Sequence, residues 1–168
     1  SRIPLTVIGG FLGAGKTTLL NRLLAQSQGS RLAVLVNDFG ALNIDAALVA
    51  SQDASTIALT NGCACCQIGD DLTGALISVL EAPQPFDGIV IETSGVSDPA
   101  EVVRSLLDPV IWKDAALETV IAMADARALA DNPALLDDAL CRSQIASADI
   151  VITATKREED LQDVPVVV

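Results

Sequence analysis

The segment GGFLGAGKTTLL, residues 9–20, limits what this chain can fold into more than any other stretch. It fits the pattern G-x-x-x-x-G-K-[ST], whose fixed positions are filled by Gly10, Gly15, Lys16 and Thr17. Glycines let the backbone wrap closely around a phosphate, to which the loop N–H groups and the start of a helix donate hydrogen bonds. An apolar run before the motif and a helical pattern after it are the setting that it requires. The segment therefore predicts a phosphate-binding loop rather than a glycine-rich turn with an incidental lysine.

Short apolar runs rich in branched side chains alternate with helix-length segments along the chain. The runs predict buried strands at Leu5–Ile8, Leu32–Val36, Gly88–Ile91, Thr119–Met123 and Asp149–Thr153. Helical spacing covers Lys16–Gln26, Leu72–Glu81, Ala100–Leu107 and Ala134–Ala146. The chain is 51% apolar but only 2% aromatic, so its core must be aliphatic, as where helices pack on parallel strands. We expect a three-layer, doubly wound α/β fold with a mostly parallel sheet, of the P-loop NTPase type.

The length and net charge of the chain limit the kinds of protein to which it can belong. We expect residues 1–168 to form a single domain, because this length suffices for a core without disulfide bonds. A formal net charge of -12 repels polyanions, which argues against nucleic acid and anionic membranes as partners. No apolar run approaches the roughly 20 residues that span a bilayer, and the start of the chain does not resemble a secretory signal. We therefore expect a cytoplasmic protein.

Polar residues follow the third predicted strand, in the segment IETSGVSDP, residues 91–99. Glu92 stands at the tip of this strand, where a carboxylate beside a phosphate loop is well placed to hold Mg²⁺. The Thr17 hydroxyl can supply a second oxygen to the same ion, while Lys16 neutralises the outer phosphates. Gly95 can offer its amide to a terminal phosphate. The residues at the end of this strand thus predict the part of the site that binds magnesium and the γ-phosphate.

Other residues after the second and third predicted strands have simpler explanations. Thr93 and Ser94 fit a turn as well as a site, and we expect Asp98 to cap the next helix. The segment NDFGALNID, Asn37–Asp45, carries two acidic residues and a glycine after a strand. This composition suits a segment that senses the phosphate or the metal, and it suits a solvated turn equally well.

Three of the four cysteines, Cys63, Cys65 and Cys66, fall within four positions on a predicted loop. Clustered thiolates favour Zn²⁺ or Cu⁺ over Mg²⁺, and three ligands without histidine leave one coordination position open. An open site suits a metal carrier. Cys63 and Cys66 also form a C-x-x-C pair suited to disulfide exchange, and buried cysteines can serve packing alone. The third thiol favours metal binding, whereas Cys141, within a helical pattern, is expected in the core.

Five segments, in this order, resemble the nucleotide domain of the CobW-type metal-chaperone GTPases, a family that includes HypB-like and UreG-like proteins. They are GGFLGAGKTTLLNRLL, VNDFGALNID, TNGCACC, IETSGVSDP and QIASADIVI, and the resemblance covers about residues 4–156. It implies a Mg²⁺-dependent GTPase that holds a transition metal on its C-x-C-C loop and couples its retention or transfer to the nucleotide state. Zinc is the first expectation for this metal, with Co²⁺ or Ni²⁺ as alternatives. The implied partners are GTP or GDP and a metal-requiring client protein, and an oligomer is compatible with the family.

The resemblance also implies roles for individual residues. Nucleotide contacts are implied for Gly10, Gly13, Ala14, Gly15, Lys16, Thr17, Thr18 and Gly95. Catalytic roles are implied for Lys16, Glu92 and the first-switch residue Asp38. The transition metal is assigned to Cys63, Cys65 and Cys66, and magnesium to Thr17 and Glu92.

Two departures from the family pattern affect these expectations. Relatives read guanine with [N/T]-K-x-D, whereas TKRE in this chain offers Thr155, Lys156 and Glu158, whose longer carboxylate leaves base selectivity open. The C-terminal domain of larger members is also expected to be absent. Two rival functions stay open at this point, a P-loop kinase of a small metabolite and a non-hydrolysing metal-binding module.

Overall fold

The computed structural model describes residues 2–27, 29–36, 49–52, 56–59, 63–68 and 71–154. Within these ranges one eight-stranded sheet runs in the order β3-β4-β5-β2-β6-β1-β7-β8. Its strands are β1 Ile3–Gly10, β2 Leu32–Val36, β3 Val49–Gln52, β4 Thr56–Leu59, β5 Ala64–Gln67, β6 Gly88–Glu92, β7 Ala115–Asp125 and β8 Ile150–Ala154. The helices are α1 Lys16–Gln26, α2 Leu72–Leu80, α3 Pro99–Ser105, α4 Pro109–Trp112, α5 Ala126–Asp131, the 3₁₀ helix η3 Pro133–Asp137 and α6 Ala139–Ala146.

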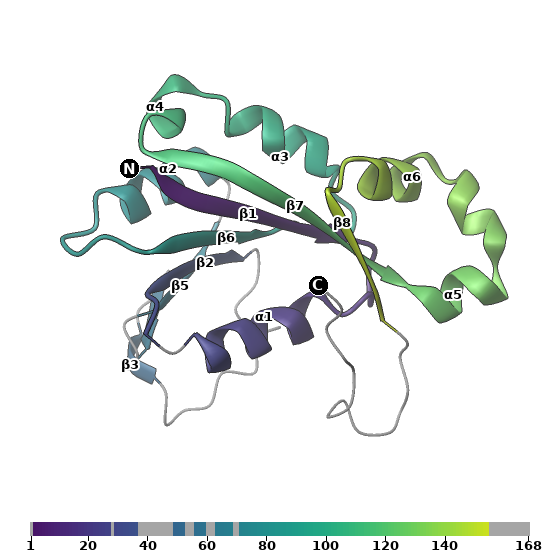
Figure 1. Cartoon of the computed structure of the whole chain (residues 1–168), viewed down its shortest axis with the longest axis horizontal. Coiled ribbons are helices and arrows are strands. Elements are labelled where there is room, and N and C mark those ends of the chain that lie inside the picture. The colour runs from purple at the N-terminus through teal and green to yellow at the C-terminus, as the bar shows by residue number, and fades with distance from the viewer. Residues whose placement is uncertain are drawn as a thin grey trace.

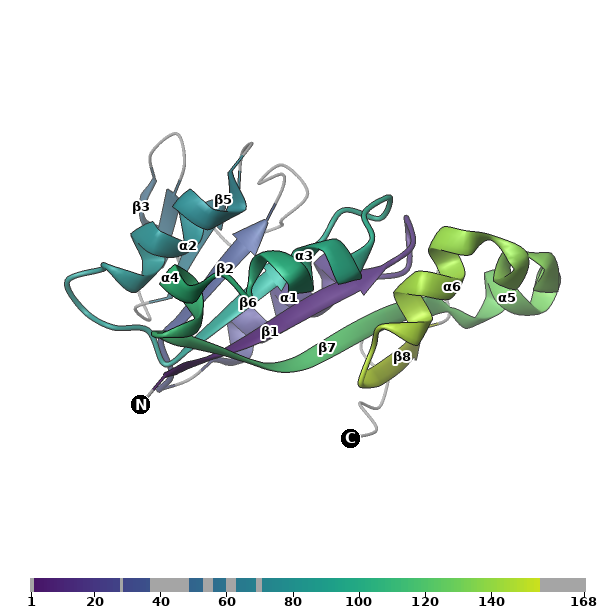
Figure 2. The ribbon, with the colours of Figure 1, turned by 90° about the horizontal axis from the view of Figure 1, so that it is seen from above.

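The sheet is parallel from β5 to β8 and antiparallel only at the β3-β4-β5 end. Helices cover both of its faces, as Figures 1 and 2 show. Leu76 of α2, Leu106 after α3 and Ile111 of α4 pack on one face, where α6 also lies. Leu20 and Leu24 of α1 pack on the other face. These layers confirm the predicted α/β fold with a mostly parallel sheet.

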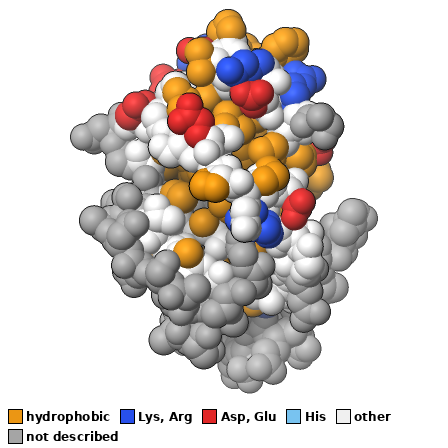
Figure 3. Space-filling view, turned by 90° about the vertical axis from the view of Figure 1, so that its left-hand side faces the viewer, with side chains coloured by type: hydrophobic (Ala, Val, Ile, Leu, Met, Phe, Trp, Pro, Cys, Tyr) orange, Lys and Arg blue, Asp and Glu red, His pale blue; other side chains and the backbone are white. Residues whose placement is uncertain are grey.

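The carboxyl ends of the parallel strands meet at the edge where β1 runs into the loop before α1 (Figure 1). The opposite end, where the strands begin, faces the viewer in Figure 3 and shows hydrophobic side chains among charged ones. There the Arg2 guanidinium lies 4.6 Å from the centroid of the exposed Trp112 ring. No helix among the described residues is both long and apolar enough to cross a membrane.

One predicted helix, Ala134–Ala146, is wrong as a single element. The structure divides it into η3 and α6 at Asp138, whose backbone is extended with φ -66° and ψ 127°. The Asp138 carboxylate accepts a hydrogen bond from the backbone N–H of Cys141 at 2.8 Å, so it caps α6. Cys141 itself is buried, as predicted. A helix-capping residue inside an apolar periodicity thus marks a boundary that the periodicity alone does not show.

Candidate functional site

The phosphate loop is built between the end of β1 and the first residue of α1. Gly10 has φ 132°, and a Cβ atom there would lie 2.2 Å from the backbone oxygen of Met123 on β7. Only glycine therefore fits at this position. Beyond it, Gly13, Gly15, Lys16, Thr17 and Thr18 line one hollow of about 250 Å³. The structure thus brings five of the residues predicted to contact the nucleotide to one concave surface, whereas Gly10 and Ala14 are buried and do not line it.

Lys16 folds back over the loop that precedes it. Its Nζ donates hydrogen bonds to the backbone oxygens of Gly10, at 2.7 Å, and Phe11, at 3.0 Å. The side chain is only 7% exposed, and burial lowers the pKa of the ammonium group while the nearby Glu92 carboxylate opposes this shift. The loop carbonyls therefore hold the ammonium group in place at the wall of the hollow.

Glu92 ends β6 directly beside β1, where it pairs with Ile8. The next residue, Thr93, is buried, and both its backbone N–H and its hydroxyl donate to the Ile8 oxygen, at 2.9 and 3.3 Å. Thr93 thus fixes the end of β6 to β1 and does not cap the next helix. Asp98 caps α3 by accepting a hydrogen bond from the N–H of Ala100 at 3.0 Å, which confirms the predicted cap.

Gly95 lies between the phosphate loop and α6. A Cβ atom on Gly95 would stand 2.7 Å from the backbone nitrogen of Leu12. On its other side the Gln144 amide nitrogen donates to the backbone oxygens of Gly95 and Ser97, each at 3.1 Å. Gln144 is the first residue of the family segment QIASADIVI, but the sequence alone assigns it no role. A further signal is that this glutamine stands one helical turn after Cys141, among the buried positions of α6.

Cys65 and Cys66 lie in a strand, so the predicted C-x-C-C loop is wrong for residues 64–67. Ala64–Gln67 forms β5, paired with β2 on one side and with β4 on the other. Side chains alternate between the two faces of a strand. Cys65 accordingly packs in the cluster on the α1 face, while Cys66 packs against the cluster on the α2 face. Neighbouring thiols of one motif are therefore separated by the sheet.

Cys63 lies at the end of the sheet where β2 begins. Its sulfur accepts a hydrogen bond from the backbone N–H of Leu32 at 3.2 Å and donates to the oxygen of Ser30 at 3.4 Å. It also lies 3.2 Å from the Ser27 hydroxyl oxygen. All four cysteines are free thiols. Among the described residues no group of three or more Cys, His, Asp or Glu is arranged to hold a metal ion.

Burial changes the acidity of Cys65. The side chain is 0% exposed, and desolvation, with smaller contributions from Cys66 and Glu92, raises the pKa of its thiol to about 12. The thiolate is the form that binds a metal. In this arrangement Cys65 is therefore a protonated core thiol at neutral pH.

Four predicted site residues lie outside the described residues. They are Asp38, Thr155, Lys156 and Glu158. Their predicted roles stay predictions.

A comparison with known families places the site in context. The sequence matches the family model described as CobW/HypB/UreG, nucleotide-binding domain, over residues 4–162. The chain belongs to the CobW/HypB/UreG family. This confirms the resemblance carried by its phosphate loop and C-x-C-C motif.

Individual family members support the same assignment. The zinc chaperone CobW of Sinorhizobium sp is 37% identical over 135 residues, which cover 77% of this chain and 38% of that protein. The zinc chaperone YjiA of Escherichia coli (strain K12) is 35% identical over 159 residues, which cover 91% of this chain and 49% of that protein. The crystal structure of the Zn(II)-bound YjiA GTPase from E. coli has a TM-score of 0.76 at 33% identity, covering 91% of this chain and 49% of that chain. The chain spans about half or less of the length of these relatives.

Proposed function

We propose that this chain is the nucleotide-binding part of a metallochaperone that hydrolyses GTP with Mg²⁺ and couples zinc retention or transfer to the nucleotide state. The observation that carries the proposal is the hollow at the head of α1, where Lys16 and Thr17 stand beside glycine backbone. Family membership supports the nucleotide, and relatives named zinc chaperones support the metal.

Lys16 and the loop N–H groups bind the β- and γ-phosphates in this proposal. Water attacks the γ-phosphorus in line with its bond to the bridging oxygen of the β-phosphate, and this bond breaks to release GDP and inorganic phosphate. Thr17 and Glu92 supply hard oxygen donors, which suit magnesium. Magnesium bound there neutralises charge on the phosphates. Gly95 offers its amide to the γ-phosphate, and Asp38 acts from the first switch. The guanine base is assigned to Thr155, Lys156 and Glu158.

Zinc is the cargo in this proposal, with Co²⁺ or Ni²⁺ as chemical alternatives for the thiolates, and a metal-requiring client protein is the recipient. The ligands are assigned to Cys63, Cys65 and Cys66. Because Cys65 and Cys66 face opposite sides of the sheet, a zinc-loaded form needs a β5 backbone different from the one described.

A second candidate follows from the same cysteines. The hydrogen bonds of Cys63 and the burial of Cys65 are what packing residues show. In this candidate the chain hydrolyses nucleotide and its thiols stabilise the sheet. Zinc binding to the reduced protein distinguishes the two.

The test combines hydrolysis and metal binding on one preparation. We expect Mg²⁺-dependent release of phosphate from GTP, and one zinc per chain that is lost when Cys65 and Cys66 are both replaced by serine. Cys141→Ser is the matched control, because that buried thiol belongs to α6 and should leave zinc stoichiometry unchanged. Hydrolysis without stoichiometric zinc would establish the second candidate, and absence of hydrolysis would overturn the proposed GTPase activity.

A further inference from the structure

Gln144 donates both hydrogens of its side-chain amide to backbone oxygens of one turn. The nitrogen donates to the backbone oxygens of Gly95 and Ser97, each at 3.1 Å, 49 and 47 residues earlier in the chain. The side chain is 2% exposed, which makes it one of the few buried polar groups among the described residues. A buried amide is costly unless it is hydrogen-bonded, so these contacts hold helix and turn together.

A second contact ties the same helix to the end of this turn. The Ser143 hydroxyl donates to the Asp98 carboxylate at 2.9 Å, and that carboxylate also caps α3. Two neighbouring residues of α6 thus hold the middle and the end of the segment between β6 and α3.

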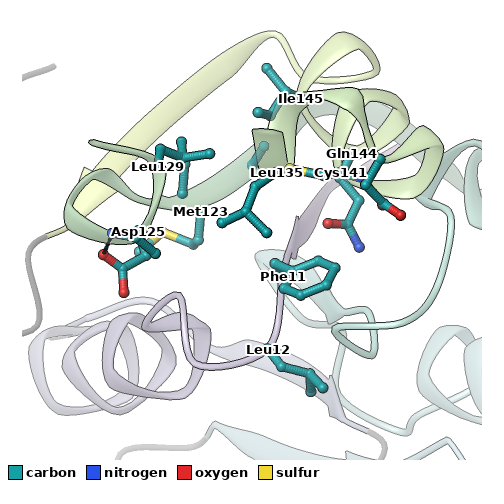
Figure 4. A pocket seen from close by; sticks show the side chains of 13 residues that line it. Phe11, Leu12, Met123, Asp125, Leu129, Leu135, Cys141, Gln144 and Ile145 are labelled. Atoms are coloured by element: carbon teal, nitrogen blue, oxygen red, sulfur yellow. Dashed lines mark hydrogen bonds between the residues drawn. The ribbon is translucent and has the colours of Figure 1, made fainter. Parts of the chain in front are cut away.

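The pocket beside Gln144 is lined mainly by apolar side chains, with Asp125 and Asp138 also in its lining. With Cys141 and Ile145, Gln144 lines this pocket of about 180 Å³ between α6, the end of β7 and the side chains of Phe11 and Leu12 (Figure 4). In a poorly solvated setting a hydrogen bond is stronger than in water, and an unpaired amide is more costly. The turn is therefore held firmly on its α6 side.

The turn is confined on its other side by the phosphate loop. The 2.7 Å that separates the Leu12 nitrogen from an added Gly95 Cβ leaves no room for a side chain between the two backbones. Gly95 accordingly has the phosphate loop on one side and the Gln144 amide on the other.

We propose that Gln144 is a positioning residue that holds the Gly95–Ser97 turn where it can meet a γ-phosphate. The inference rests on the proposed function, which assigns the Gly95 amide to that phosphate. GDP has no γ-phosphate, so loss of Gln144 should weaken the binding of a GTP analogue and leave GDP binding in place. A residue with only a structural role would affect both nucleotides alike.

The test replaces Gln144 by methionine, which keeps length and flexibility but removes both donors. We expect affinity for a non-hydrolysable GTP analogue, measured by calorimetry with Mg²⁺, to fall about tenfold, as the loss of two modest hydrogen bonds predicts. Affinity for GDP should stay within about twofold. Ser147→Ala is the matched control, because its hydroxyl donates to the Ser143 oxygen within α6 and not to the turn. Hydrogen exchange of residues 94–98 should quicken in Gln144→Met and stay unchanged in the control.

Each outcome tests either the positioning role of Gln144 or the proposed hydrolysis of GTP. Equal weakening of both nucleotides, or unchanged exchange in the turn, overturns the positioning role. Equal binding of analogue and GDP by the unmodified protein overturns it as well, because the turn then senses no γ-phosphate. Selective loss of analogue binding in Gln144→Met upholds the role even if the unmodified protein does not hydrolyse GTP, a result that would overturn only the proposed hydrolysis.

Discussion

Cys65 and Cys66 are adjacent in β5 yet pack on opposite faces of the sheet. Cys65 is buried with the residues beneath α1, and Cys66 contacts the cluster beneath α2. The two thiols can reach one metal ion only if the strand leaves its pairing with β2 or β4. The metal binding that we propose for this motif would therefore require a change of pairing at one end of the sheet.

The first prediction concerns thiol reactivity. At pH 7 and without metal, Cys65 should react with iodoacetamide far more slowly than Cys66, because it is fully buried and its pKa is raised to about 12. Peptide mass spectrometry after timed alkylation measures both residues in one sample. If Cys65 reacts as fast as Cys66, the buried position of Cys65 does not describe the protein in solution.

The second prediction concerns pH and stability. The Cys65 thiol has a usual pKa of 9.0 and a folded pKa of about 12, so between these values the folded state binds more protons than the unfolded state. Its contribution to the free energy of unfolding is therefore fully present below about pH 9 and is lost as the pH rises toward 12. Cys65→Ala should lose stability less steeply over this range. The lowered pKa of Lys16 makes the free energy of unfolding change with pH in the opposite direction, but it does so in both proteins. The difference between their denaturation curves therefore isolates the contribution of Cys65.

The third prediction concerns the phosphate loop. Lys16→Ala should reduce GTP hydrolysis by about 100-fold or more, because the charge facing the phosphates is removed. The fold should persist, since the ammonium group bonds only to loop carbonyls in the described structure. Lys113→Ala is the control, a surface lysine paired with Asp114. Phosphate release measured beside circular dichroism checks both points, and comparable turnover in Lys16→Ala would remove the phosphate-loop assignment.

The fourth prediction separates binding from catalysis. Glu92→Gln keeps the side-chain size at the end of β6 but removes the charge proposed for the magnesium shell. Single-turnover hydrolysis should therefore slow more than nucleotide binding weakens. Asp87→Asn offers a matched control on the loop before β6, where the carboxylate accepts a hydrogen bond from the Arg31 N–H. Unchanged single-turnover rates in Glu92→Gln would leave Glu92 with a structural role only.

The sequence predicts those parts of the fold that depend on local signals. The apolar run Leu32–Val36 and the helical pattern Lys16–Gln26 match β2 and α1 residue for residue. α1 also has a strong local start signal, the left-handed Gly15 that precedes it. The helical pattern Ala134–Ala146 fails because it ignores the capping carboxylate of Asp138.

The parts of the structure that the sequence does not predict depend on contacts between residues that are distant in the chain. Ala64–Gln67 has no branched or aromatic side chain and no regular alternation, and it becomes a strand because β2 and β4 lie on either side of it. The role proposed for Gln144 likewise depends on a hydrogen bond to a turn 49 residues earlier in the chain. The phosphate loop is visible in the sequence because its chemistry is local, whereas the opposite orientation of Cys65 and Cys66 appears only once the strand is known.

The zinc affinity of the reduced protein in two nucleotide states shows whether its metal site and its nucleotide site are coupled. Competition with a chromophoric chelator should give one zinc per chain, bound about 5- to 150-fold more tightly with Mg²⁺ and a non-hydrolysable GTP analogue than with Mg²⁺ and GDP, the usual range for coupled sites. Zinc should tighten analogue binding relative to GDP by the same factor, because the coupling is reciprocal. Identical zinc affinity in both nucleotide states would contradict the account, even if the protein bound zinc and hydrolysed GTP.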